Sequence, residues 1–260
     1  MHEKIEPFKK LIEELLNNAK ILVEENNLSY TIDKANNMVL EEYDKWIQEG
    51  VGIQITHNHL EYMLISGLRL DWTNEKILDD NNTYIYGSFF LHGVLEPIVF
   101  PSYFWEVYND PIEDEKQRET LQKLGYFQRS AHGDDGTFGC FYRESKEYPF
   151  PIYFYDNGIY FPMTLNLDKY FEAMLFCKAV VLWQYFYLEP KDIINGLEGL
   201  NCDDWISLYS DLEGNPPRVE GIIKHMDVLI RQFPLLFPDF EISFFKNKRD
   251  ALLIEYNSSN

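Results

Sequence analysis

The sequence predicts an α+β fold in which a mixed, mostly antiparallel sheet is flanked by helices. Two consecutive β-hairpins are predicted over residues 124–161, where short aromatic and aliphatic runs alternate with turns rich in Gly, Asp and Asn. Apolar residues also recur every three or four positions near the N-terminus and after residue 166, which is the period of a helix. With 260 residues, 45% of them hydrophobic, the chain has enough apolar surface for a large core.

The N-terminal part is predicted to be helical. Residues 5–25 carry apolar side chains at helical spacing and are expected to form one amphipathic helix. Asp33 is a candidate N-cap for a second helix, in which Trp46 and Ile47 point inward. Glycines at positions 50 and 52 are expected to end this second helix.

The segment between residues 53 and 123 is less regular. Residues 53–56 alternate like a strand, and the aromatic and aliphatic runs at 84–91 and 97–100 are two further strand candidates. Residues 110–124 are mostly charged or polar and carry an early proline, which predicts a surface helix after a turn.

The two hairpins lead into a very apolar segment. Residues 124–132 and 138–142 form the first predicted hairpin, and residues 152–155 and 159–161 form the second. Asn166 is a candidate N-cap for an apolar helix that we expect to continue to residue 188. The most apolar part of that helix is shorter than the roughly 20 residues that span a bilayer. We therefore expect a buried helix and no membrane association.

The composition changes after residue 188. We expect residues 1–188 to form the α+β core and residues 189–260 to form a mixed C-terminal α/β extension, packed on the core as one compact unit. A proline at 216 or 217 can open a helix, because the N–H that proline lacks would have no partner in the first turn of a helix. Alternation at 240–245 and an apolar run at 251–256 predict a final pair of strands.

Charge gives the strongest signal about partners. The chain has 43 acidic and 23 basic residues, a formal net charge of -20, and the acids are spread along the whole sequence. Such a field repels nucleic acid and anionic lipid and speeds encounter with basic partners. The same charge would also keep a protein with 18 tyrosines and 19 phenylalanines in solution. Neither nucleic acid nor a membrane is therefore an expected partner.

Metal and cofactor sites find little support. His57, His59 and Glu61 would share one face of a strand and could present two imidazoles and a carboxylate. This pattern is common by chance, and no companion ligand cluster is visible. The three cysteines are far apart and form no CxxC pair. We expect no metal ion and no cofactor.

One carboxylate pair could support catalysis. Glu106 and Asp110 lie one helical turn apart beside the aromatic residues 103–105, a setting that suits a carbohydrate-active hydrolase. With 43 acids in the chain, however, most carboxylates simply face solvent. Nucleophile-elbow, zinc-protease, deaminase and kinase motifs are absent from the sequence. We therefore do not expect an enzyme, and the hydrolase stays as the alternative.

The hairpin region resembles the SUKH superfamily of bacterial immunity proteins. Residues 124–138, with Gly133-Asp134-Asp135-Gly136 at the turn, are similar to the family's glycine- and acid-containing hairpin. Residues 151–156 resemble its next strand, in which a proline precedes an aromatic run that ends in an acid. Residues 165–175 resemble its closing helix. The resemblance covers about residues 84–188 and says nothing of the C-terminal extension.

This resemblance implies an α+β fold and a protein that neutralises a cognate toxin without catalysis. A basic protein toxin is the expected partner, because the negative field favours such a surface. Partner-binding residues are expected among Asp134, Asp135, Glu144 and Asp156, with exposed tyrosines as anchors. A scaffold of the same fold remains a further alternative. The N-terminal residues show no basic-then-apolar signal pattern, so the cytoplasm is the expected location.

Overall fold

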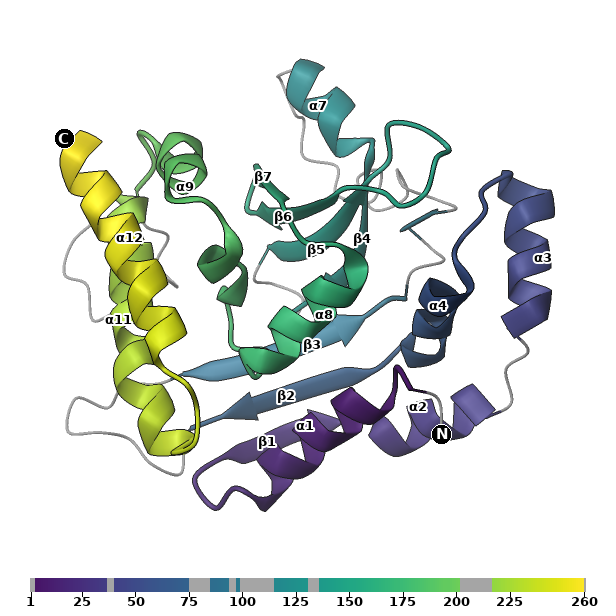
Figure 1. Cartoon of the computed structure of the whole chain (residues 1–260), viewed down its shortest axis with the longest axis horizontal. Coiled ribbons are helices and arrows are strands. Elements are labelled where there is room, and N and C mark those ends of the chain that lie inside the picture. Colours follow the sequence, from purple (N-terminus) through teal and green to yellow (C-terminus); the bar gives the residue numbers. More distant parts are fainter. Residues whose placement is uncertain are drawn as a thin grey trace.

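The computed structural model describes residues 3–36, 40–74, 85–93, 97–98, 115–130, 136–201 and 217–259. In this part of the chain, helices surround one seven-stranded sheet, which confirms the predicted α+β class (Figure 1). The strands lie in chain order from β1 to β7, and all six neighbouring pairs are antiparallel. The sheet is therefore a simple meander, without the parallel pairs that a mixed sheet would contain.

The described elements have the following bounds. The strands are β1 (Leu22–Asn26), β2 (Arg69–Thr73), β3 (Tyr86–Leu91), β4 (Leu124–Arg129), β5 (Thr137–Tyr142), β6 (Ile152–Asp156) and β7 (Ile159–Met163). The helices are α1 (Glu6–Asn17), α2 (Leu28–Asn36), α3 (Leu40–Val51), α4 (His57–Leu60), α7 (Glu115–Leu121), α8 (Leu167–Phe176), α9 (Pro190–Leu197), α11 (Arg218–Leu236) and α12 (Ser243–Ser259). Two short 3-10 helices are η1 (Glu61–Ile65) and η2 (Trp183–Tyr187).

Both predicted hairpins are confirmed, as is the strand predicted at residues 84–91. Strands β4 and β5 pair from Leu124 opposite Tyr142 to Arg129 opposite Phe138, with a bulge between Tyr126 and Gln128. Strands β6 and β7 form the second hairpin. Buried and half-buried residues alternate along β6, where successive side chains point to an inner and an outer face of the sheet.

The inner face of the sheet is packed against α1 and α8 by aromatic rings. Phe127 of β4 contacts both Tyr170 and Phe171 of α8, at centroid distances of 5.0 and 5.8 Å. Phe8 of α1 meets Phe171 edge to face at 5.7 Å. Edge-to-face pairs of this kind add roughly 0.5–1.5 kcal/mol beyond the area that they bury.

The two outermost strands of the sheet are both poor templates for pairing with another chain. Strand β1 exposes Glu24 and Glu25, and β7 contains Pro162, which cannot donate a backbone hydrogen bond. Helix α9 also packs against β7.

The single N-terminal helix predicted for residues 5–25 is shorter than expected. Helix α1 ends at Asn17, and Leu22 and Val23 pair instead with Thr73 and Trp72 of β2. Pairing with the sheet outweighs the helical spacing in this segment, because the strand ladder satisfies the backbone groups that a longer helix would have satisfied.

The second predicted helix is also partly wrong. Asp33 lies inside α2 rather than at a cap, and a separate helix, α3, follows. The predicted end is correct: Gly52 has a φ of +72° and follows Val51, the last residue of α3. Ile47 is buried as expected, whereas Trp46 is 49% exposed.

Three predictions concern the middle of the chain. Residues 53–56 are not a strand but an irregular segment before α4, with Ile53 and Ile55 buried. Residues 97 and 98 are helical, and 99–100 lie outside the described residues, so that strand prediction is wrong where it can be checked. The surface helix predicted within 110–124 is present as α7.

The apolar helix predicted from Asn166 to residue 188 begins correctly but stops early. The Asn166 side chain accepts a hydrogen bond from the Lys169 N–H, as an N-cap does. Helix α8 ends at Phe176, and a turn with positive φ at Lys178, Ala179 and Leu182 then leads into η2.

Tertiary hydrogen bonds hold this turn and explain why the helix does not continue. Trp72 Nε1 donates to the Lys178 carbonyl at 2.8 Å, and the Ser88 N–H donates to the Ala179 carbonyl at 2.9 Å. His225 Nε2 lies 3.1 Å from the Val181 carbonyl oxygen. Burial lowers the pKa of His225 to about 4, so this ring is neutral at pH 7.

The C-terminal extension is helical in the described residues. Pro217 is the N-cap of α11, as the prolines predicted. The strands predicted at 240–245 and 251–256 are wrong, because α12 covers the second half of the first segment and all of the second. Phe245 of α12 stacks on Phe186 of η2 at 4.1 Å. One hydrophobic cluster runs from Ile5 to Leu252, so residues 189–260 share their core with residues 1–188.

Candidate functional site

The four acids predicted to bind a partner have different environments. Asp134 and Asp135 lie outside the described residues. Glu144 follows β5 and is exposed, with its carboxylate 3.5 Å from Lys123 Nζ. It therefore has the accessibility that the prediction requires.

Asp156 does not fit the prediction. Its side chain is fully buried and accepts hydrogen bonds from Arg218 Nη2 at 2.8 Å and from the Tyr185 hydroxyl at 2.5 Å. Asp156 is two residues after Phe154 and four after Ile152, so it shares the inner face of β6 with these buried residues. It holds the start of α11 against the sheet and is not available to a partner.

The predicted histidine–carboxylate metal pattern is also corrected. His57 begins α4 and Glu61 begins η1, so these residues do not share the face of a strand. His59 is already engaged by Tyr148 and Asp168. No group of three potential metal ligands occurs among the described residues. Glu106 and Asp110, the candidate hydrolase pair, lie outside this part of the chain.

A polar cluster that the sequence reading missed surrounds Asp168, in the first turn of α8. Lys4 Nζ and the Tyr62 hydroxyl each donate to Asp168 Oδ1 at 2.6 Å. His59 Nε2 lies 3.2 Å from Oδ2, while its Nδ1 lies 2.5 Å from the Tyr148 hydroxyl oxygen. Burial raises the pKa of Asp168, but the hydrogen bonds from Lys4, Tyr62 and His59 outweigh this effect and lower it to about 2. This cluster fastens the N-terminus and η1 to α8.

The Asp168 cluster predicts a pH-dependent loss of stability. Because the pKa is about 2 in the folded chain and 3.8 ordinarily, the carboxylate stabilises the fold above about pH 4 and loses this effect as the pH falls toward 2. We expect Asp168→Asn to cost up to about 2 kcal/mol at pH 6, reduced by solvent screening of the ion pair. Urea unfolding at pH 6 and pH 2.5 measures the difference, which should shrink at the lower pH.

Asp192→Asn is the matched control for this experiment. Asp192 is also in the first turn of a helix, α9, but it is exposed. Its replacement should change the free energy of unfolding by less than about 1 kcal/mol. An Asp168→Asn deficit of equal size at both pH values would show that the lowered pKa does not contribute to stability.

The outer face of the sheet carries a row of tyrosines, here called the tyrosine ladder, formed by Tyr142, Tyr153 and Tyr160. These residues come from β5, β6 and β7, and their ring centroids lie 5.0 Å and 6.4 Å apart. All three are half-buried. Burial raises the pKa of Tyr153, and the nearby Tyr142 and Glu144 raise it further by smaller amounts, so its hydroxyl stays protonated at neutral pH. The ladder is a candidate contact surface of the kind that the tyrosine content predicted.

The charges beside the tyrosine ladder are mixed. Lys123 Nζ lies 5.8 Å from the Tyr142 ring centroid and pairs with Glu144. Lys146 and Glu147 follow as exposed residues. This surface therefore offers aromatic anchors without a negative potential of its own.

Helix α3 combines an exposed aromatic residue with a strongly acidic surface. Its twelve residues include four acids and one lysine. Glu42 and Glu49 lie four residues before and three residues after Trp46, so they flank the indole on one helical face. Ile47 is fully buried and anchors this helix to the rest of the fold. Figure 1 shows α3 at the margin of the molecule, far from α11 and α12.

Comparison with known proteins gives no relative. No family model, no curated protein and no solved structure matches this chain. In the part of the chain that the structure describes, no helix has both the length and the apolar character needed to cross a bilayer.

Proposed function

We propose that this chain is a non-catalytic immunity protein that binds and neutralises a basic protein toxin. Two independent observations support the proposal. The residues that carry the resemblance to the SUKH superfamily lie in two hairpins and the first turn of the following helix, an arrangement compatible with that family. Helix α3 supplies an acidic face with an aromatic anchor, and this observation carries the proposal.

The two features of α3 would contribute differently to binding. Its acidic residues, together with the net charge of -20, attract a basic surface from a distance and raise the association rate. Trp46 presents a large ring that loses its remaining exposure on contact, and tryptophan is one of the residue types enriched among energetically dominant interface positions. The ring would therefore slow dissociation while the acids speed encounter.

Helix α3 fits a basic partner better than the tyrosine ladder does. Around the ladder, Lys123 and Lys146 offset Glu144 and Glu147. On α3, only Lys45 opposes four acids, and it lies 3.9 Å from Glu49. Since like charges across an interface are costly, a basic toxin favours the α3 surface over the ladder.

Replacing Trp46 tests the anchor. With a basic protein that this chain captures from its native cells as the partner, Trp46→Ala should weaken binding by about 30-fold or more, mainly through faster dissociation. Surface plasmon resonance measures both rates, and growth of toxin-producing cells reports neutralisation. Ile254→Ala is the matched control, because Ile254 is also an exposed apolar residue but lies on α12.

Neutralising the two flanking acids tests the steering. The double variant Glu42→Gln, Glu49→Gln should lower the association rate several-fold at 10 mM salt and much less at 150 mM, where the Debye length is only about 8 Å. If both α3 variants bind and protect as the unmodified chain does, α3 is not the contact surface. Turnover of a substrate by the purified chain would instead contradict the non-catalytic function.

A further inference from the structure

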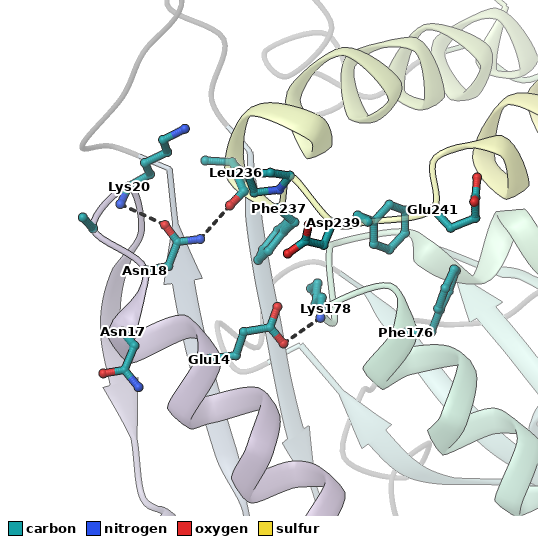
Figure 2. Close-up of a pocket in the computed structure, with 13 residues that line it drawn as sticks. Glu14, Asn17, Asn18, Lys20, Phe176, Lys178, Leu236, Phe237, Asp239 and Glu241 are labelled. Atoms are coloured by element: carbon teal, nitrogen blue, oxygen red, sulfur yellow. Dashed lines mark hydrogen bonds and ion pairs between the residues drawn. The ribbon is translucent and has the colours of Figure 1, made fainter.

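A groove of about 710 Å³ opens where three distant segments of the chain meet. Its walls come from the end of α1 and the following turn, from the end of α8, and from the linker between α11 and α12 (Figure 2). The volume lies within the range of about 300–1,000 Å³ that is typical of ligand sites. It is far from α3, so the groove is a separate site from the proposed toxin surface.

One wall of the groove is aromatic. Phe176, at the end of α8, is 38% exposed and lies 4.9 Å from the ring of Phe240. Phe237 lines the groove next to Phe240 and is supported from behind by Trp72, whose ring is 5.9 Å away. Phe237 is almost fully buried, so Phe176 offers the exposed ring face that can receive an alkyl chain or a cation.

The chain already places one of its own cations against this wall. Lys178 Nζ lies 5.5 Å from the Phe237 ring centroid and 2.7 Å from Glu14 Oε2. Lys178 is also one of the residues with a positive φ, held there by the hydrogen bond from Trp72 to its carbonyl. The groove thus combines an aromatic face and a carboxylate around an ammonium group, which is the chemistry of cation recognition.

Two further carboxylates in the groove remain exposed. Asp239 and Glu241, in the linker between α11 and α12, are both solvent-accessible groove residues. The other lysine of the lining, Lys20, donates its Nζ hydrogen bond to the Leu235 carbonyl at 2.5 Å. Figure 2 shows Asp239 beside Phe237 and Glu241 on the same side as Phe176. A second cation could therefore meet a ring and a carboxylate at once.

We propose that this groove binds an extended peptide segment through an arginine side chain. The guanidinium stacks on Phe176 and pairs with Glu241 on the same side of the groove, because its planar form suits both an aromatic face and a carboxylate. The amide of Asn17 at the groove wall offers a donor and an acceptor to the peptide backbone. The groove volume exceeds what one side chain fills, so the flanking residues of the segment also enter it.

The test is an NMR titration of the full chain with the peptide Ac-Leu-Arg-Leu-NH₂. We expect saturable shifts of the backbone amides of Lys178 and residues 237–241. The matched ligand has citrulline in place of arginine, which keeps the shape and removes the charge. It should bind about tenfold more weakly, as should the arginine peptide to Phe176→Ala or Glu241→Gln.

Glu198→Gln is the control variant, because Glu198 is an exposed acid outside the groove lining. It should leave the titration unchanged, and unshifted amides elsewhere would show that each variant is folded. Equal binding of the citrulline peptide would overturn the proposal, since charge would then play no part. Shifts confined to α3 would also overturn it, while leaving the proposed toxin surface in place.

Discussion

Replacing Arg218 with methionine is expected to lower the free energy of unfolding by about 3–5 kcal/mol. The side chains of Arg218 and Asp156 are 4% and 0% exposed, and the Nη2–Oδ1 distance is 2.8 Å. Without the guanidinium, the buried carboxylate loses this ion pair, which is the costly change. The hydrogen bonds from the Tyr185 hydroxyl and the Asn157 side-chain amide remain, but these groups carry no positive charge. Urea denaturation at pH 7 measures the loss.

Two companion variants separate the buried charge from the lost packing. The double variant Asp156→Leu, Arg218→Met removes both charges and should recover much of the stability lost by the single change. Lys45→Met removes one partner of the exposed pair with Glu49 and should change stability by less than about 1 kcal/mol. A double variant as unstable as Arg218→Met would show that packing, not charge, dominates this site.

Gly87→Val is expected to destabilise the fold by about 2–4 kcal/mol. A Cβ atom at position 87 would lie 2.1 Å from Trp72 Nε1, because the indole crosses the glycine on the neighbouring strand. Overpacking of this kind costs about 1–3 kcal/mol. Displacing the indole would also break its hydrogen bond to the Lys178 carbonyl, which adds about 1 kcal/mol or more. Thermal and urea unfolding measure the effect.

Gly50→Val is the control for this substitution. Gly50 lies in α3, has nothing within 4 Å of its would-be Cβ, and has no positive φ. Valine there should be neutral or slightly stabilising, because glycine is the poorer helix former. If Gly87→Val were as stable as the unmodified chain, the indole would not be fixed across β3, and the turn at Lys178 would need another explanation.

Elements specified by neighbouring residues were predictable from the sequence. The hairpins of β4–β5 and β6–β7 follow from alternation and turn residues, and the starts of α8 and α11 follow from Asn166 and Pro217. The turn at 177–182 was not predictable, because Trp72 and His225 hold it from far away in sequence. Helix α12 was predicted as strands because apolar residues alternate near its start. The same residues also suit a helix, and the packing of Phe245 on Phe186 and Phe240 decides for the helix.

The candidate sites show the same limit. The burial of Asp156 was predictable, because in a strand it shares a face with Ile152 and Phe154. The prediction instead ended this strand at residue 155. Trp46 was expected to point inward because it shares an apolar stripe with Ile47, and only packing decides which of the two is covered. The groove is lined by three segments that are each separated by more than 50 residues in the sequence, so no local pattern could predict it.

The guarded edges of the sheet restrict how any partner can join this protein. An incoming strand would meet the carboxylates of Glu24 and Glu25 at one border, and Pro162 together with α9 at the other. Recognition by strand addition is therefore disfavoured, and so is fibre growth from chain to chain. Association is instead expected through side chains, whose identity can change without disturbing the ladder of backbone bonds beneath them.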